Sequence, residues 1–169
     1  MMYNLHYMDK VKIKACLEGQ QEKFKSEFSV NFSAALKNLN PKIPKTELLG
    51  SLKQLSKKLV VPNEAVHKTV LLISDGMENS KVTSFYHKNN IKNIKPLATI
   101  AKLRRKGMIG FWKDADIYMY GTGLMPDKKK YADPKVVMNL KHFWERYFIE
   151  GGAKTAEIGT PELLITSID

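Results

Sequence analysis

The feature that most constrains the fold is a short apolar run, Val70–Ile73, that ends abruptly at Ser74–Asp75–Gly76. The run is too short for a helix, contains β-branched residues and is closed by a turn dipeptide, so it predicts a buried strand. A strand that is apolar throughout is typical of a parallel sheet with helices on both faces. Because ligands of such sheets bind beyond the carboxyl ends of the strands, Asp75 becomes a candidate site residue. A plain turn at Asp75–Gly76 is the alternative.

Length and composition indicate one domain over residues 1–169. Its 43% hydrophobic residues suit a real core. No apolar run reaches the length of a membrane span, and the N-terminus lacks a signal-peptide core, so no membrane partner is expected. The one cysteine, Cys16, excludes an internal disulfide and is typical of a buried thiol in a reducing cytoplasm. We therefore expect a cytoplasmic protein.

The charge balance favours acidic partners. The chain has 28 Lys and Arg against 17 Asp and Glu, a formal net charge of +11. Nucleic acid is one such partner, although the lysines are spread along the whole chain. The candidate anion contacts are Arg104, Arg105, Lys128, Lys129 and Lys130. The two arginines can equally serve a helix C-terminus, and the three lysines can be a solvated loop tip.

Three segments precede the apolar run. Val11–Leu17 alternates apolar and basic residues, which predicts a strand near a sheet edge. Gln20–Leu39 carries apolar residues at helical spacing and predicts an amphipathic helix whose aromatic stripe packs in the core. A second helix is predicted from Thr46, as cap or first-turn residue, to Leu59. The aromatic stripe consists of Phe24, Phe28 and Phe32.

Three further elements follow the Asp75 turn. Pro96 predicts a helix that stops at Gly107, and Ala115–Tyr120 predicts a strand running into a glycine turn. Asp133–Glu150 is the clearest helix, with Asp as cap and Pro in the first position. Gly159–Ile165 can form a last short strand. The face of the clearest helix that we expect on the sheet contains Leu140, Phe143, Trp144 and Tyr147.

This order of elements predicts an α/β, Rossmann-like three-layer sandwich with a mostly parallel sheet flanked by helices. Within it, the segment Val70–Ser80 resembles the central strand and metal-site loop of von Willebrand factor type A domains. Thr46–Leu52 is similar to the threonine loop of that family, which leads into an amphipathic helix. The resemblance covers most of residues 10–150.

The resemblance implies a Mg²⁺ or Mn²⁺ site at the top of the sheet. By position, Thr46 matches the family's threonine ligand and Asp75 its later aspartate. The family's Asp-x-Ser-x-Ser loop has no counterpart here, and Asp9–Val11 does not supply one. The implied domain is therefore incomplete at its N-terminus, lacking the first strand. With two protein ligands we expect weak Mg²⁺ or Mn²⁺ binding at most, because Mg²⁺ demands near-octahedral oxygen coordination.

Three function classes follow from these observations. The first is a non-enzymatic protein-interaction domain with an incomplete metal site, able to self-associate through an exposed strand edge. The second is a basic nucleic-acid-associated protein of a DNA-processing or mobile-element assembly, with Tyr86 or Trp112 stacking on bases. The third is a magnesium-dependent phosphoryl hydrolase that uses Asp75 and Glu78. We favour the first, since the sequence offers no catalytic set.

Overall fold

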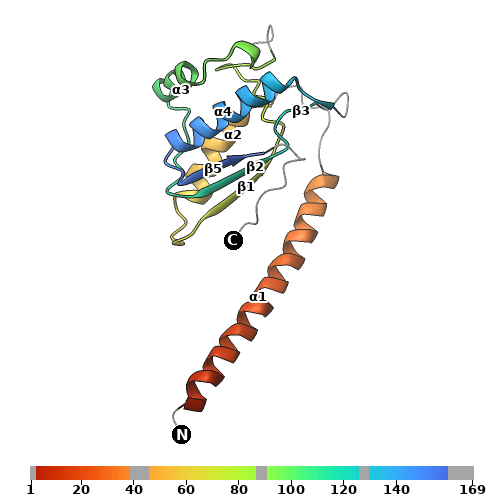
Figure 1. Cartoon of the computed structure of the whole chain (residues 1–169), viewed down its shortest axis with the longest axis vertical. Coiled ribbons are helices and arrows are strands. Elements are labelled where there is room, and N and C mark those ends of the chain that lie inside the picture. The colour runs from red at the N-terminus through yellow and green to blue at the C-terminus, as the bar shows by residue number, and fades with distance from the viewer. Residues whose placement is uncertain (1–2, 39–45, 87–90, 126–129, 160–169) are drawn as a thin grey trace. The chain divides into compact units, whose positions relative to one another are not determined.

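The structure, a computed structural model, describes residues 3–38, 46–86, 91–125 and 130–159. Its internal contacts divide the chain, predicted as one domain of residues 1–169, into two compact units, Met1–Ile43 and Pro44–Asp169. The described part of the first unit is one helix, α1, and the described strands all belong to the second unit (Figure 1).

Helix α1 spans Tyr3–Lys37 without interruption, so the predicted strand at Val11–Leu17 is wrong. Alternation over so short a stretch also satisfies a helical period, because Ile13 and Leu17 lie four residues apart on one helix face. No proline interrupts the segment, and only two of its seven residues are β-branched. Helical propensity therefore outweighs the apparent period of two.

The aromatic stripe of α1 is exposed, which corrects the prediction that it packs in the core. Phe24 is 68% exposed, Phe28 48% and Phe32 38%. The three rings stack on one another along the helix, with centroids 6.1 Å and 5.6 Å apart. The Cys16 thiol, expected to be buried, is also exposed.

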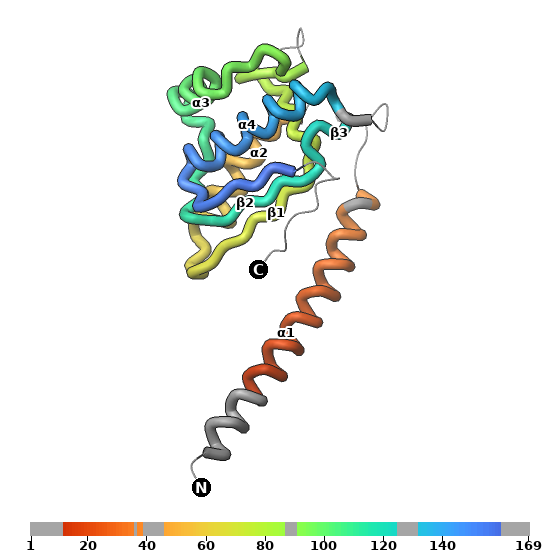
Figure 2. The backbone as a smooth tube through the Cα atoms, in the orientation of Figure 1, coloured from red at the N-terminus to blue at the C-terminus, as the bar shows by residue number. Residues whose placement is uncertain are grey.

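Three parallel strands form the sheet of the second unit, in the order β1-β2-β5 (Figure 2). They span Thr69–Ile73, Asp116–Tyr120 and Thr155–Ile158. The prediction of an α/β fold with a mostly parallel sheet flanked by helices is confirmed. Strand β5 was not predicted, because Thr155–Ile158 is short and only half apolar; the strand expected at Gly159–Ile165 falls, from Thr160 onward, outside the described residues.

The remaining helices are close to their predicted positions. Helix α2, Leu48–Leu55, continues into the π-helical turn η1, Ser56–Val60. Helix α3, Pro96–Arg105, has proline in its first turn and ends before Gly107, whose φ of 61° is left-handed. The structure also contains a short antiparallel pair, β3, Leu124–Met125, with β4, Lys130–Tyr131.

Helix α4, Pro134–Glu150, supplies the centre of the core, as predicted. The Asp133 side chain accepts a hydrogen bond from Lys135 N, which caps its N-terminus. Trp144 Nε1 donates to Gly76 O at 2.9 Å and so ties α4 to the loop after β1. The fully buried side chains of α4 are Leu140, Phe143, Trp144, Tyr147 and Phe148.

Side chains of α2, α3 and α4 pack on the face of the sheet that carries Ile117 and Met119. Ile117 and Met119 of β2 are fully buried and belong to one core cluster with side chains of α2, α3 and α4. Burial alternates along β1, where Leu71 is 47% exposed and Ile73 64%. The expectation that β1 is covered on both faces is therefore wrong. One face of β1 is covered and the other is exposed, yet both faces carry apolar side chains. The periodicity of the sequence therefore cannot show that one face is exposed.

Candidate functional site

The loop after β1 carries the predicted metal ligand Asp75. Asp75 Oδ1 accepts a hydrogen bond from Met77 N at 2.9 Å, and Ser74 Oγ accepts one from Gly76 N at 3.1 Å. These bonds close a tight turn that Gly76 permits with a φ of 73°. Burial raises the pKa of the Asp75 carboxyl above its ordinary value, although the Met77 N–H lowers it in part. One oxygen of this half-buried carboxylate therefore already accepts a hydrogen bond within its own loop.

The carboxyl ends of the three strands meet beside this loop. Gly123 N–H donates to Asp75 O at 2.8 Å, and Thr122 N–H donates to Gly159 O at 3.3 Å. The Thr122 hydroxyl is buried and has no hydrogen-bond partner among the described residues. Ligands of parallel sheets bind at this edge, and the sequence analysis predicted the candidate site here.

Thr46 lies at the start of α2, next to the same loop. Its carbonyl oxygen accepts a hydrogen bond from Asn79 N at 2.9 Å, so the backbone brings it close to the segment that follows Asp75. Thr46 was predicted to be the cap or a first-turn residue of α2, but it precedes the helix and is not its cap. The N-cap position is Glu47, whose side chain makes no cap bond.

The N-terminus of α2 is capped by Glu78, a role that the sequence did not predict for this residue. Glu78 Oε2 accepts a hydrogen bond from Leu49 N at 2.9 Å, and the side chain is fully buried. Burial raises the pKa of this carboxyl, while the Ser80 hydroxyl and the backbone N–H groups of Leu49 and Leu48 lower it. A carboxylate at this position neutralises the positive end of the helix. Because Glu78 points into the protein, it does not form an open pair with Asp75.

Few side chains near Asp75 are therefore placed to coordinate a metal ion. Among the residues that the structure describes, no three His, Cys, Asp or Glu side chains lie together as a metal site would require. Thr46 O accepts a hydrogen bond from the N–H of Asn79, four residues after Asp75 in the chain, and the Glu78 carboxylate is turned toward α2. The predicted incomplete metal site at Thr46 and Asp75 stays a prediction.

The predicted anion contacts are distributed over two elements. Arg104 and Arg105 are exposed in the last turn of α3, and Arg104 forms an ion pair with Glu150. Lys130 belongs to β4, and Lys128 and Lys129 lie outside the described residues. Trp112, expected to be available for base stacking, is completely buried against Phe148. The described members of the predicted set thus belong to two different elements, α3 and β4.

Strand β1 lies at one edge of the described three-stranded sheet. Among the described residues β1 pairs with β2 alone. Asp116 N–H donates to Lys68 O and Ser74 N–H donates to Tyr120 O, both at 2.8 Å, so the even-numbered residues of β1 bond to β2. The odd-numbered residues direct their backbone groups outward. They are Thr69, Leu71 and Ile73.

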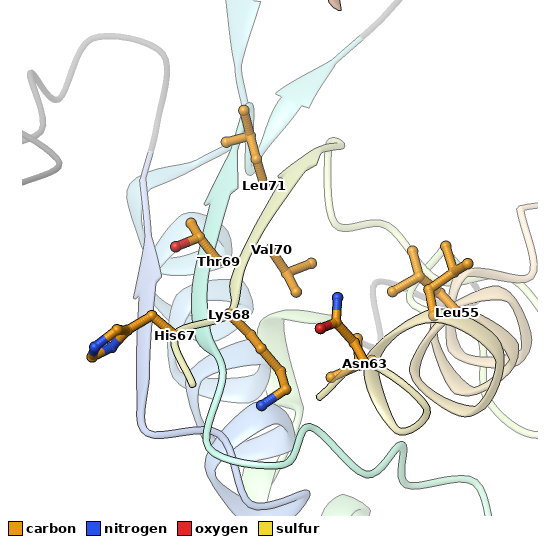
Figure 3. Close-up of a pocket in the computed structure, with 9 residues that line it drawn as sticks. Leu55, Asn63, His67, Lys68, Thr69, Val70 and Leu71 are labelled. Carbon is orange, nitrogen blue, oxygen red and sulfur yellow. The ribbon is translucent and has the colours of Figure 1, made fainter. Parts of the chain in front are cut away.

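A hollow of about 360 Å³ lies beside this edge (Figure 3). In Figure 3 the Val70 side chain points toward Leu55 of α2, whereas Thr69 and Leu71 point away from that helix. The apolar side chains of the hollow come from α2, η1 and β1, and Lys68 and His67 stand at its polar end. The residues that line it are Leu55, Leu59, Val60, Asn63, His67, Lys68, Thr69, Val70 and Leu71.

Comparison with known proteins found no matching family model, no matching curated protein and no matching solved structure. Among the described helices, none is long and apolar enough to cross a membrane.

Proposed function

We propose that residues 44–169 form a non-enzymatic protein-interaction domain, similar to von Willebrand factor type A domains, with an incomplete metal site. The observation that carries the proposal is an edge of β1 that pairs with no other strand among the described residues and lies beside an apolar hollow. An extended segment of a partner binds there by adding a strand to the sheet.

The backbone of β1 provides the affinity of this mode of binding. Outward N–H and C=O groups on alternate residues are the groups that an added strand bonds. The edge has none of the usual protection, since Thr69–Ile73 contains no charge and no proline. The edge of β1 is therefore suited to pairing with an added strand.

The hollow provides the selectivity. A strand laid along β1 directs every second side chain toward α2 and η1, because side chains alternate along a strand. Leu55, Leu59 and Val60 then receive an apolar side chain. The neighbouring Lys68 favours an acidic residue at that end of the bound segment.

Selection from a random peptide display library tests the proposal. The full chain is the target, and a Leu71→Pro variant is used for counter-selection, because proline removes an outward N–H without removing a bond to β2. We expect the enriched peptides to alternate apolar residues, to lose binding to Leu71→Pro and to Ile73→Lys, and to bind a Leu97→Lys control normally. Leu97 is an exposed leucine on α3, far along the chain from β1. Peptides that bind all variants equally, or no enrichment, would refute the proposal.

A second candidate, a basic nucleic-acid-associated protein, is favoured by the exposure of Arg105 and Lys106 at the end of α3. Cations of this kind bind phosphates without sequence preference. A salt titration with random-sequence DNA separates the two functions. Affinity that falls steeply with salt and is weakened by Arg105→Ala supports this candidate, and no binding at low salt removes it.

A further inference from the structure

We propose that β1 pairs antiparallel with β1 of a second copy of this chain, centred on Leu71, and thereby joins two three-stranded sheets into one of six strands. The inference rests on the proposed role of the β1 edge and names the segment that occupies it. The pairing is symmetric, because both copies use the same surface, and it closes after two copies.

The backbone geometry suits this register. When two strands run antiparallel about Leu71, each odd-numbered residue faces an odd-numbered residue of the other copy, Thr69 opposite Ile73 and Leu71 opposite Leu71. These are the residues whose N–H and C=O groups point away from β2. All three opposed pairs can therefore exchange hydrogen bonds, and every outward backbone group of β1 finds a partner.

Charge selects the antiparallel direction. His67 and Lys68 precede β1, and Ser74 and Asp75 follow it. Antiparallel pairing brings Lys68, just before β1, close to the turn of the other copy that carries the Asp75 carboxylate. Parallel pairing in register would instead place Lys68 beside a second Lys68, which is repulsive.

Side chains on the covered face fit the same arrangement. Val70 faces Leu72 of the other copy, and both point toward the helices, since even-numbered side chains of β1 lie on that face. The hollow beside Val70, lined by residues of β1, α2 and η1, would receive the added side chain. Leu59, 66% exposed on η1, borders the hollow and would be covered by the second copy.

The opposite edge of the sheet is less suited to self-pairing. Strand β5 has an exposed glutamate, Glu157, in its middle, and Lys154 precedes it. Like charges facing one another across two β5 strands would oppose association. The apolar, uncharged edge is β1, so the second copy binds there.

Cysteine crosslinking of the full chain tests both partner and register. The natural cysteine is first replaced (Cys16→Ser), and single cysteines are then introduced at Thr69, Leu71 or Ile73. In the proposed dimer the two Cα atoms of residue 71 are about 5.5 Å apart, within disulfide range. The two Cα atoms of residue 69 are offset by four residues, about 14 Å. A mild oxidant should therefore link Leu71→Cys and leave Thr69→Cys and Ile73→Cys unlinked.

A mixture of Thr69→Cys with Ile73→Cys should crosslink again, because these positions face each other across the dimer. Equal crosslinking of all three single variants would show parallel pairing and overturn the register. Crosslinking no stronger than that of a Leu97→Cys control would overturn self-pairing. Loss of the dimer in a Phe28→Glu variant of α1, with Leu71→Pro still dimeric, would also overturn it. Peptide binding by the wild-type chain is measured separately, so the proposed function can stand where the dimer fails.

Discussion

Glu78 shows how a single buried residue joins two parts of the second unit. It follows the β1 turn, and its carboxylate accepts the Leu49 N–H at the start of α2. Glu78→Ala leaves this buried donor without an acceptor, and we expect a loss of about 1–3 kcal/mol in the free energy of unfolding. Urea denaturation measures this loss. Glu47→Ala is the matched control, since the exposed Glu47 side chain makes no cap bond, and an equal loss there would contradict the assignment.

The raised pKa of Glu78 also sets a pH dependence. Because the folded pKa lies above the ordinary value of 4.5, the folded state binds more protons than the unfolded state between the two values. The stabilisation from protonation is complete below about pH 4.5 and is lost as pH rises through the folded pKa. We expect the wild-type chain to lose stability with rising pH in this window relative to Glu78→Gln. An opposite sign of the difference would contradict the burial of this carboxyl.

Substitution of Trp144 tests how much a single buried side chain of the core contributes to stability. It is fully buried, packs edge-to-face against Phe143 and Tyr147, and donates to Gly76 O. Trp144→Ala should lower the free energy of unfolding by about 3–5 kcal/mol. Phe111→Ala provides the control, because Phe111 is 59% exposed. A comparable loss in both variants would show that Trp144 contributes no special packing.

Thr46 and Asp75 lead to a prediction about metal binding. They are the two predicted ligands, and Asp75 Oδ1 already accepts the Met77 N–H. Calorimetry with Mg²⁺ and Mn²⁺ should detect weak binding or none, since two ligands replace little of the hydration shell. Micromolar binding that disappears in Asp75→Ala would mean that the site is complete.

At the element scale, prediction from sequence succeeded where several signals agreed. Helix α4 has a cap, a first-turn proline, a wide apolar face and terminal glycines, and its observed bounds match the predicted ones. Strand β1 was located correctly, but its exposure was not, because an apolar run does not reveal whether a second layer covers it. Strand β5 lacks a strong signal, and Glu78 was missed as a cap since it lies 29 residues after Leu49 in the chain. Contacts of that separation are set by tertiary structure.

Helix α1 offers a prediction that isolates helical propensity from packing. Gly19 lies in its middle, and a methyl group added there meets no atom within 4 Å. Gly19→Ala should therefore stabilise α1 by about 0.8–1 kcal/mol, measured as increased helicity and slower amide exchange. In contrast, Gly76→Ala should destabilise the fold, because the added carbon would lie 2.9 Å from Trp144 Nε1 and φ is positive. No gain in α1 helicity for Gly19→Ala would mean that residues near Gly19 are not helical in solution.

At the scale of the whole molecule, the proposed dimer predicts that stability depends on chain concentration. A dimer that forms only from folded chains makes the melting temperature rise with concentration, since mass action favours the associated state. A tenfold increase corresponds to about 1.4 kcal/mol of dimer, or a rise of about 3 °C for a unit of this size. Leu71→Lys places a charge opposite its own copy in the proposed register, and it should remove this dependence. Leu97→Lys adds the same charge at another exposed leucine and should retain it.

Scanning calorimetry across a concentration series, with sedimentation at each concentration, provides the measurement. A melting temperature that is independent of concentration, together with monomers throughout, would show that the edge remains unpaired in the isolated chain. A dependence that survives Leu71→Lys would place the association elsewhere on the molecule.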